Sequence, residues 1–592
     1  MILGLPETSD GPPTVTHLQR PSTGRHLVMV CAIVALTTLP FAAKAVHIDD
    51  VYFLEVAGNV LKDPWRPFAG AVALEDIDYR VFAAAGRCPS TFASMSHPPL
   101  VPYVMALVAA LYGEFREWPL HLAFALFALG AALAMYDLAR RFTRPPLLTT
   151  LLLVSSPVFV MSAQSLMTDM PALALSLAAL AIFIRGTDGG VGRRLLVAGV
   201  LAGLAILTRY SALLVLPLFC AYAFGQGRLR KAWPALLGVL GVLSLWAIQN
   251  FAVHGESHIV ASARHYRLFF ADGSLDWTGL LKKALGDLSG LGGTSFVAAA
   301  LLVVTGLRRR LVTFGLSLLA AAMVFVVRPA GIERLDLYSV LEVIAVAASF
   351  AGGASLLVEA LWRTPTATQP VGTAERDGAF LTAWLVLSIG GALFLLPFGT
   401  ARYMLPVLPP LWILLVRRFW DRDDGLPRVR GATRLVVAQG LALSLVLGTV
   451  DEEYAGRYRD LSVQIRESYP QRKVWFVGEW GFRHYMSQAG GTYLKSTDDT
   501  PQSGDVVVRP FIAGMHEISP SLLARSALVE QIPLPSRWPI RVMNFDAKAG
   551  YYSVHWGYLP WAVSNAPLEL VDVFEVRSKA PPIERITTCA SS

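Results

Sequence analysis

The amino-acid sequence predicts a polytopic α-helical membrane protein with a C-terminal α/β domain, and three observations support this fold class. Hydrophobic residues make up 54% of the 592-residue chain and charged residues only 16%, against about 25% charged residues in soluble proteins. Apolar runs of about 17 to 25 residues, long enough to cross a hydrocarbon core of about 30 Å, recur along most of the chain. From residue 451 onward, short β-rich segments alternate with Gly, Pro and Asp turn signals instead.

The period and length of the apolar runs predict thirteen membrane spans. They cover residues 26–46, 119–138, 146–162, 170–185, 194–208, 211–225, 232–250, 294–307, 311–327, 337–361, 379–397, 402–416 and 433–450. A further apolar stretch, 98–112, is short for a span and carries three prolines near its start. We therefore expect 98–112 to lie at the membrane face or to re-enter the membrane without crossing it.

Basic residues between the spans predict the orientation of the chain, because Lys and Arg are enriched in cytoplasmic loops. With thirteen crossings, all basic clusters fall on the same side as the N-terminal Arg20 and Arg25. A fourteenth crossing at 98–112 would place every cluster on the opposite side. The clusters are Arg140, Arg141 and Arg144; Arg193 and Arg194; Arg228, Arg230 and Lys231; Arg308, Arg309 and Arg310; and Arg417, Arg418, Arg428 and Arg430.

This orientation divides the chain into a tail, a membrane domain and an outer domain, in a protein of the plasma or inner membrane. The parts are a cytoplasmic N-terminal tail (1–25), a transmembrane domain (26–450) with a first extracytoplasmic loop that includes a juxtamembrane helix (47–118) and a second large extracytoplasmic loop (251–293), and a soluble extracytoplasmic α/β domain (451–592). The net charge of +8 is spread over short clusters between spans, so the sequence does not indicate nucleic-acid binding.

Two adjacent carboxylates, Asp49 and Asp50, follow the first span. Acidic side chains at the mouth of a span are costly unless they face water, another polar group or a substrate. Neighbouring side chains diverge on a helix and on a strand, so both carboxylates are not expected to serve one reacting atom. One of them is a candidate general base for an acceptor hydroxyl. The alternative is that both residues merely end the span in water.

Five further residues are expected on the same outer face. Asp169 begins a span, where Thr168 or Asp169 caps the helix and the same helix start can also face an outer cavity. Arg402, which precedes Tyr403, and Arg209 lie at outer ends of spans, where an arginine reaches lipid headgroups or binds a phosphate through its guanidinium fork. His97 is a surface histidine or a hydrogen-bond donor to a phosphate. No spacing of His and Cys indicates a zinc site, and the need for a divalent cation is left open.

The order of several motifs resembles a known group of enzymes. The motifs are Asp49-Asp50-Val51-Tyr52-Phe53, His97-Pro98-Pro99-Leu100, Tyr136…Ala139-Arg140-Arg141, Ser156-Pro157…Thr168-Asp169-Met170-Pro171 and Arg402-Tyr403-Met404-Leu405-Pro406. Over residues 26–450 this order resembles the GT-C membrane glycosyltransferases of the protein O-mannosyltransferase and aminoarabinose-transferase kind (glycosyltransferase family 39 and relatives).

The resemblance implies an inverting transferase that takes a sugar from a polyprenyl-phosphate carrier at the outer membrane face. It implies that Asp49 is the base and that Asp169 is the later acidic residue of the site. Basic residues hold the carrier phosphate in this family, and Arg402 and His97 are the candidates here, with Arg209 as a further one. A protein, a glycolipid or a polysaccharide is the expected acceptor.

Two positions depart from the pattern of this family. The family often has Glu at the position of Asp50, and aminoarabinose transferases often have Lys at the position of His97.

The alternative function is a transporter or flippase for a lipid-linked or small polar substrate. Transporters place charges and broken helices near the bilayer midplane and show paired repeats. Here the ionisable candidates gather at one face and no internal repeat is visible.

Overall fold

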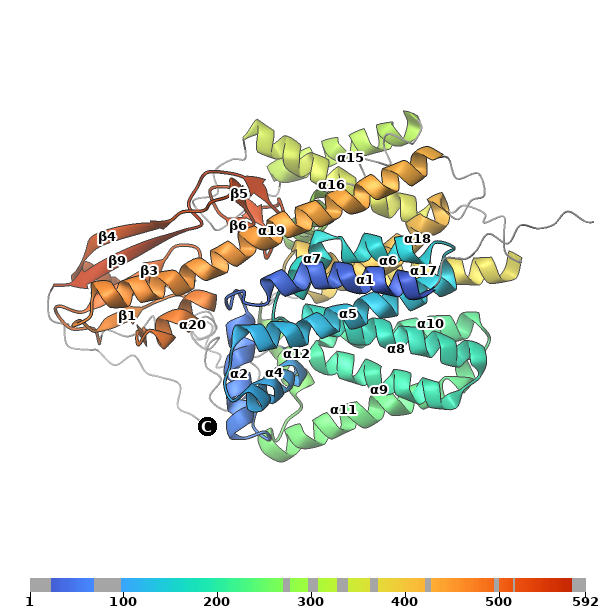
Figure 1. Cartoon of the computed structure of the whole chain (residues 1–592), viewed down its shortest axis with the longest axis horizontal. Coiled ribbons are helices and arrows are strands. Elements are labelled where there is room, and N and C mark those ends of the chain that lie inside the picture. Colours follow the sequence, from blue (N-terminus) through green and yellow to red (C-terminus); the bar gives the residue numbers. More distant parts are fainter. Residues whose placement is uncertain are drawn as a thin grey trace, which may run out of the picture.

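The computed structural model describes residues 23–68, 97–269, 277–295, 307–326, 339–362, 371–420, 427–494, 500–514 and 517–577. Long apolar helices form a bundle, and a small β-structure lies at one end of this bundle (Figure 1). Among the described residues, seven helices are long and apolar enough to cross a membrane, or eight if the bent pair α6 and α7 counts as one span. The protein is therefore a polytopic helical membrane protein.

Except for 294–307, most of which lies outside the described residues, each expected span overlaps a helix of the bundle. The elements are α1 (Thr23–Thr38), η1 (Leu39–Phe41), α5 (Glu117–Phe142), α6 (Pro146–Val154), α7 (Pro157–Ala163), α8 (Asp169–Gly189), α9 (Gly192–Thr208), η3 (Tyr210–Leu214), α10 (Val215–Gly225), η4 (Leu229–Lys231), α11 (Trp233–His254), α15 (Leu307–Val326), α16 (Val340–Leu361), α17 (Val371–Leu395), η5 (Ala401–Val407), α18 (Leu408–Phe419) and α19 (Pro427–Ser468). The number of crossings stays a prediction.

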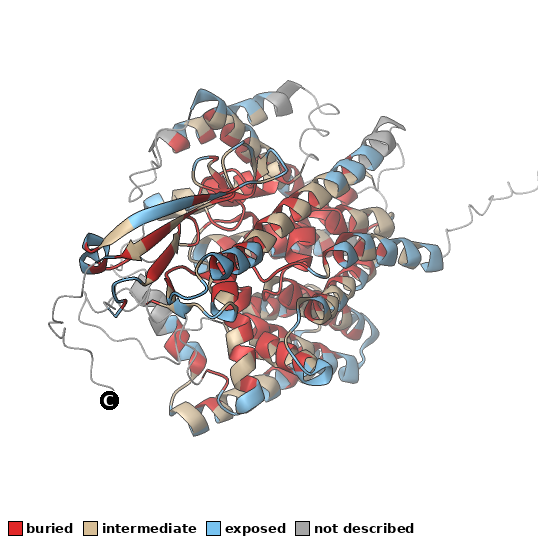
Figure 2. Ribbon diagram, turned by 60° about the vertical axis from the view of Figure 1, so that its left-hand side comes forward, coloured by how far each residue is buried: buried red, intermediate tan, exposed pale blue. Residues whose placement is uncertain are grey.

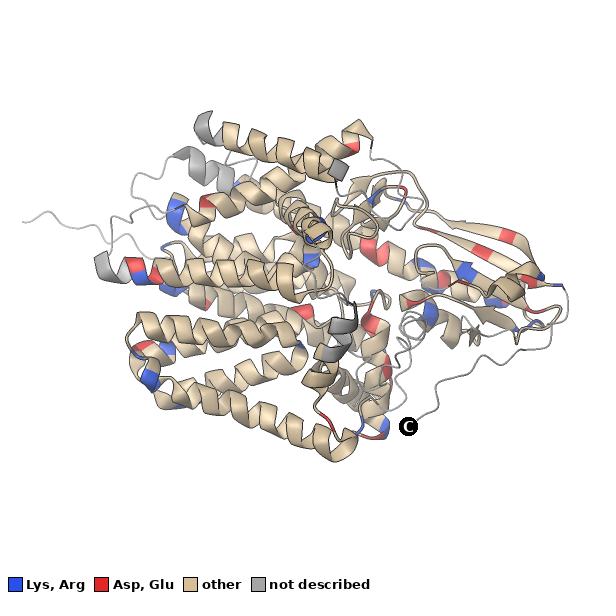
Figure 3. Cartoon of the chain, turned by 180° about the vertical axis from the view of Figure 1, so that it is seen from behind, with Lys and Arg blue, Asp and Glu red and all other residues tan. Residues whose placement is uncertain are grey.

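Charged side chains are distributed unevenly along the bundle. Lys and Arg gather at the helix ends opposite the β-structure, whereas the middle of the described bundle is almost entirely uncharged (Figure 3). Arg140 and Arg141 lie in the last turn of α5, and Arg417 and Arg418 in the last turn of α18. This clustering at one end is the pattern on which the predicted orientation rests. Which end faces the cytoplasm stays a prediction.

Glycines allow the helices to pack closely. A Cβ atom at Gly199 of α9 would lie 2.0 Å from the carbonyl oxygen of Ala235 in α11, and one at Gly238 of α11 would lie 2.5 Å from that of Leu196. Small residues at helix contacts let two backbones approach, which stabilises helix pairs in a membrane. Buried residues fill the centre of the bundle and exposed ones its periphery (Figure 2).

Among the described residues before α19, four further helices lie outside this set of bundle helices: α2 (Asp50–Lys62), α4 (Leu100–Tyr112), α12 (His258–Phe269) and α13 (Trp277–Gly293). Helix α2 stands across the end of the bundle that is nearer to the β-structure, and α4 packs against it (Figure 1). The 13 residues of α4 extend about 20 Å, less than the thickness of a hydrocarbon core. This length agrees with the expectation that 98–112 does not cross.

Helix α19 joins the bundle to the β-structure without a break. It is 42 residues long, so the division expected at residue 451 falls inside a helix and not between two domains. The apolar run ends near that residue, but the helix continues because one face remains buried at helical spacing. The buried positions on this face are Asp451, Tyr454, Ala455, Tyr458, Leu461, Ser462 and Ile465.

The β-structure is a five-stranded mixed sheet with the order β2-β1-β3-β9-β4, accompanied by two short strand pairs, β5–β8 and β6–β7. Strand β1 is parallel to β2 and β3, whereas β9 is antiparallel to β3 and β4. The elements are β1 (Val474–Phe476), α20 (Trp480–Gln488), β2 (Thr492–Tyr493), β3 (Val506–Pro510), α21 (Pro520–Ala524), β4 (Ser526–Leu534), β5 (Ile540–Arg541), β6 (Met543–Asn544), β7 (Ala549–Gly550), β8 (Ala562–Val563) and β9 (Glu569–Val576).

One hydrophobic core connects the β-structure to the first loop. It combines residues of α2, α4 and the second half of α19 with the inner face of the sheet. Polar contacts reinforce this connection, since the hydroxyl of Tyr52 in α2 donates to Glu479 at 3.2 Å and Arg483 of α20 lies 3.4 Å from Glu55. The C-terminal region is thus packed firmly onto the elements that carry the candidate site.

Candidate functional site

Asp49 lies at the start of α2, directly after a residue with a strained backbone. Ile48 has φ = 45°, in the left-handed region that a β-branched residue rarely adopts. The turn leads the chain from the end of the first span into α2, with Asp49 as the N-cap residue. The side chain of Asp49 is 35% exposed, so an incoming group can reach its carboxylate. Strain of this kind persists where the surrounding structure holds it, often at functional sites.

Asp50 is buried and hydrogen-bonded to backbone. Its two carboxylate oxygens accept from the amide of Leu166 at 3.0 Å and from that of His47 at 3.2 Å. Burial raises the pKa of Asp50 to about 7, and this effect outweighs the opposing charge of Lys44 and the two hydrogen bonds. The two neighbouring carboxylates therefore diverge as expected. The contacts of Asp50 are those of a residue that holds the loop before α8 against the start of α2.

Asp169, the first residue of α8, pairs with two arginines. Its carboxylate forms a short ion pair with Arg209 and lies 3.9 Å from Nη1 of Arg402. All three side chains are at least nine-tenths buried. Thr168, the N-cap residue of α8, makes no side-chain capping bond, and Asp169 is the acidic residue of the first turn. The carboxylate turns toward the arginines.

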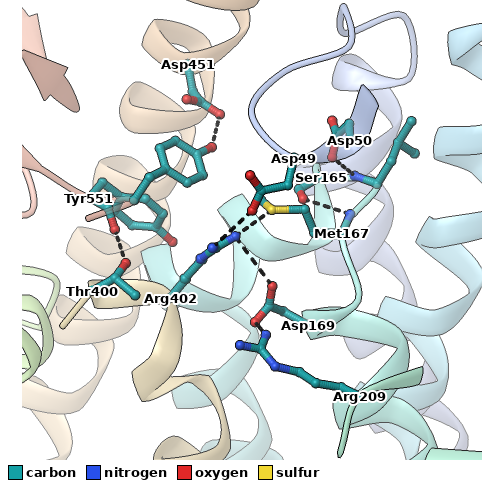
Figure 4. Close-up of polar contacts among 12 residues, drawn as sticks. Asp49, Asp50, Ser165, Met167, Asp169, Arg209, Thr400, Arg402, Asp451 and Tyr551 are labelled. Atoms are coloured by element: carbon teal, nitrogen blue, oxygen red, sulfur yellow. Dashed lines mark hydrogen bonds and ion pairs between the residues drawn. The ribbon is translucent and has the colours of Figure 1, made fainter. Parts of the chain in front are cut away.

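Arg402 is the central cation of the site (Figure 4). Its Nη2 lies 3.3 Å from Oδ2 of Asp49, and its Nη1 lies 2.6 Å from the thioether sulfur of Met167. A thioether is a weak acceptor, and Nε of Arg402 has no hydrogen-bond partner among the described residues. The guanidinium is therefore buried with part of its donor capacity unused. A phosphate would satisfy such donors with charge-assisted hydrogen bonds.

Tyr403 stands beside both arginines. The centroid of its ring lies 4.9 Å from Cζ of Arg209 and 5.3 Å from Cζ of Arg402. Both distances are within the range of a cation–π contact. The ring helps to hold the two guanidinium groups near each other despite their like charge.

His97 lies near this cluster, at the start of α4. Its ring stacks on Phe53 of α2 with a centroid distance of 6.0 Å. Burial, with a further contribution from Arg209, lowers the pKa of His97 to about 3, so the imidazole is neutral at neutral pH. A neutral imidazole still offers one N–H donor. Within the described ranges, no three His, Cys, Asp or Glu side chains are placed to hold a metal ion.

A largely apolar pocket leads to the cluster from inside the bundle. Its wall follows one face of α8 from Asp169 to Leu180, a length of about 16 Å at the rise of an α-helix. Helices α10 and α17 supply the other walls, and Arg209 and Tyr403 line the pocket together with Asp169. The pocket can thus hold a long apolar chain with a polar head at its charged end.

Sequence reasoning missed a second buried cluster next to the first loop. Nζ of Lys44 lies 2.5 Å from Asp451 of α19, and the hydroxyl of Tyr552 donates to the same carboxylate at 2.6 Å. The ring of His47 lies 3.6 Å from Asp451 and is buried against three tyrosines. A single Lys inside an apolar stretch, at position 44, was the only available signal for this cluster.

The geometry defines a membrane protein in which acidic and basic side chains, far apart in sequence, meet at the end of an apolar pocket. Residues 96–248 match the family model PMT_2, dolichyl-phosphate-mannose-protein mannosyltransferase. For that part of the chain, the match confirms the resemblance to the GT-C glycosyltransferases of the protein O-mannosyltransferase kind. No curated protein matches the chain.

Three solved structures align with the chain at low identity. The oligosaccharyltransferase of Archaeoglobus fulgidus shares 12% identity over 79% of this chain and 62% of its own, with a TM-score of 0.45. ArnT of Cupriavidus metallidurans, bound to undecaprenyl phosphate, shares 14% over 95% and 100% (TM-score 0.35). The arabinofuranosyltransferase AftD from Mycobacteria shares 14% over 94% and 40% (TM-score 0.41). This chain spans less than two thirds of the archaeal enzyme. With TM-scores below 0.5, these alignments do not define its function.

Proposed function

We propose that the protein is an inverting glycosyltransferase that moves a sugar from a polyprenyl-phosphate-linked donor to an acceptor hydroxyl at the extracytoplasmic membrane face. The observation that carries this proposal is the apolar pocket that ends at Asp169, Arg209 and Tyr403, next to Arg402 and Asp49. A pocket with this lining fits the isoprenoid chain, and its charged end fits the phosphate. The family description, which names a dolichyl-phosphate sugar donor, supports the same substrate class.

The carrier phosphate binds to the arginines in this proposal. Arg402 and Arg209 are both buried, so their attraction to a phosphate is weakly screened by water. Arg402 contacts Asp49 at 3.3 Å and the thioether of Met167. A phosphate is a better acceptor than the thioether and draws the guanidinium toward itself. Binding of the donor thereby frees the carboxylate of Asp49 for its role with the acceptor.

Asp49 acts as the general base. Its carboxylate takes the proton of the acceptor hydroxyl while the acceptor oxygen forms a bond to the anomeric carbon. The bond from that carbon to the phosphate oxygen breaks on the opposite side, and the configuration inverts. The electron pair leaves with the polyprenyl phosphate, whose charge is stabilised by Arg402 and Arg209. A phosphate leaving group of this kind needs no general acid.

The predicted sidedness follows from the distribution of charge. The candidate site and the β-structure lie toward one end of the bundle, and the basic clusters gather at the other (Figure 3). Basic loops favour the cytoplasm, which supports an extracytoplasmic site and acceptor. The N-terminus is then cytoplasmic, and the protein is an integral protein of the plasma or inner membrane.

The test is sugar transfer by the purified full-length protein in lipid nanodiscs, with Asp49→Asn as the variant. We expect transfer to fall by about 10²- to 10⁴-fold, the usual contribution of a general base. The affinity for the polyprenyl-phosphate donor should stay the same or rise, because Asp49 competes for Arg402. Full transfer activity in the variant would remove the mechanism. Transport of the donor across sealed vesicles without any transfer would favour a transporter instead.

The sugar and the acceptor can be identified by comparing cells with and without the gene. Mass spectrometry of their envelope glycans, glycolipids and glycoproteins should show one sugar missing from one class of acceptor. Restoring the gene should return that sugar, and the Asp49→Asn variant should not. An unchanged glycan inventory would contradict an envelope acceptor.

A further inference from the structure

The C-terminal region reaches the turn that carries Arg402. The hydroxyl of Thr400 donates to the carbonyl oxygen of Tyr551 at 2.5 Å, and the amide of Val554 donates to the carbonyl oxygen of Gly399 at 3.1 Å. The segment 551–554 thus runs directly along the turn before η5. The C-terminal region is therefore next to the site and not a separate module on its rim.

The side chain of Tyr551 enters the site from this segment. Figure 4 shows its ring lying beside Arg402, with the hydroxyl directed toward that side chain. Tyr551 is only 1% exposed, and its hydroxyl proton has no acceptor among the residues that the structure describes, although the hydroxyl of Ser162 acts as a donor toward the phenol oxygen. Unpaired buried hydroxyls are unusual in proteins because each loses its hydrogen bonds to water without replacement.

Two unused donors therefore belong to neighbouring side chains. Nε of Arg402 and the hydroxyl of Tyr551 both lack an acceptor among the described residues. Burial raises the pKa of Tyr551, and the negative charges of Asp451 and Asp169 act in the same direction, so the phenol keeps its proton. A protonated phenol beside a guanidinium is a donor pair that matches an anion with several acceptor oxygens.

We propose that Tyr551 donates a hydrogen bond to the phosphate of the lipid-linked donor, so that the C-terminal region supplies one group of the phosphate site. This inference rests on the proposed function, which supplies the phosphate. It assigns to the C-terminal region a part in binding the donor, beyond any part in recognising the acceptor.

The experiment compares two adjacent tyrosines in the full-length protein in lipid nanodiscs. The probes are undecaprenyl phosphate and undecaprenol, which differ only in the phosphate. Tyr551→Phe should weaken binding of undecaprenyl phosphate about tenfold or more, as expected for a hydrogen bond to a charged group. Its binding of undecaprenol should not change. Its melting temperature should stay close to that of the wild type, since only the contact with the hydroxyl of Ser162 is lost.

Tyr552→Phe is the matched control, because the hydroxyl of Tyr552 is already bound to Asp451 at 2.6 Å. It should lower the melting temperature and leave the preference for phosphate over alcohol unchanged. Two outcomes would overturn this inference but not the proposed function. In one, Tyr551→Phe binds each probe as tightly as the wild type does. In the other, Tyr551→Phe loses the same affinity for undecaprenol as for undecaprenyl phosphate. A wild-type protein that binds undecaprenol as tightly as undecaprenyl phosphate would overturn the proposed function and this inference with it.

Discussion

The guanidinium of Arg402 lies 3.3 Å from the carboxylate of Asp49, although 353 residues separate them in the chain. Asp49 belongs to the turn after the first span, and Arg402 to a 3-10 helix before α18. This ion pair links the candidate base to the candidate phosphate ligand. It therefore couples the two halves of the proposed reaction.

Two substitutions of Arg402 should distinguish the effect of its positive charge on transfer from the effect of its forked guanidinium geometry. Arg402→Gln should lower kcat/KM about 10²- to 10³-fold, as does the loss of one group that stabilises a developing charge. Arg402→Lys keeps the charge but loses the fork that holds two phosphate oxygens, so it should retain part of the activity. Arg116→Gln, which removes a half-exposed arginine that does not line the pocket, is the control and should transfer normally. Steady-state kinetics with a lipid-linked donor measures all three, and normal activity in Arg402→Gln would contradict the phosphate assignment.

A bulky side chain in the apolar pocket should impair transfer from donors with a long isoprenoid chain and spare donors with a short one. Leu177 lines the pocket about 12 Å along α8 from Asp169. Leu177→Trp should raise KM for a long polyprenyl-phosphate donor by about tenfold or more, because the added ring occupies the path of the chain. A donor with a single isoprene unit does not reach this depth and should be transferred normally. Leu196→Trp on the exposed face of α9 is the matched control, and an equal effect on both donors would argue against the pocket as the chain site.

The stability of the protein should depend on pH through Asp50. Its pKa is about 7 in the folded protein and about 3.8 when unfolded, so the folded state holds the extra proton between these values. The contribution of Asp50 to the free energy of unfolding is therefore largest below about pH 4 and is lost as the pH rises through 7. Asp50→Asn should remove this component, and the melting temperature of the wild type relative to the variant should fall from pH 4 to pH 7. Thermal unfolding in detergent measures the difference, and parallel curves would contradict the assignment.

The buried pair of Lys44 and Asp451 should behave as a unit. Either Lys44→Met or Asp451→Asn leaves a buried charge without its partner, and each should cost about 3 to 5 kcal/mol of stability. The double variant removes both charges and should be more stable than the sum of the two losses predicts. A thermal-unfolding double-mutant cycle measures this coupling, and strictly additive losses would show that the two residues do not interact.

Much of the helical bundle can be predicted from the sequence because the patterns that indicate its helices are local. Apolar length predicted the helices of the bundle, and the short proline-rich stretch 98–112 predicted the short helix α4. The basic clusters placed Asp49, Asp169 and Arg402 on one face, and the structure brings these three side chains together. Their contacts follow because a buried arginine and buried carboxylates near the membrane are costly unless opposite charges pair.

The rest depended on contacts that sequence does not encode locally. The partner of Lys44 is 407 residues away, and the contact of Thr400 with Tyr551 bridges 151 residues. Nothing near Tyr551 marks it as a site residue, since it lies in an irregular segment between short strands. The end of the apolar run near residue 450 also concealed the continuation of α19. The helical spacing of Tyr454, Tyr458 and Ile465 was the signal that could have revealed it.

Because α19 is a single helix of about 63 Å, the β-structure has no hinge at that connection. In the proposed reaction, the acceptor is therefore not admitted by tilting the β-structure away from the bundle there. The continuous helix also fixes the rotational position of the residues after 451 relative to the bundle. One inserted residue near 451 would rotate everything beyond it by about 100° and carry Tyr551 away from Arg402.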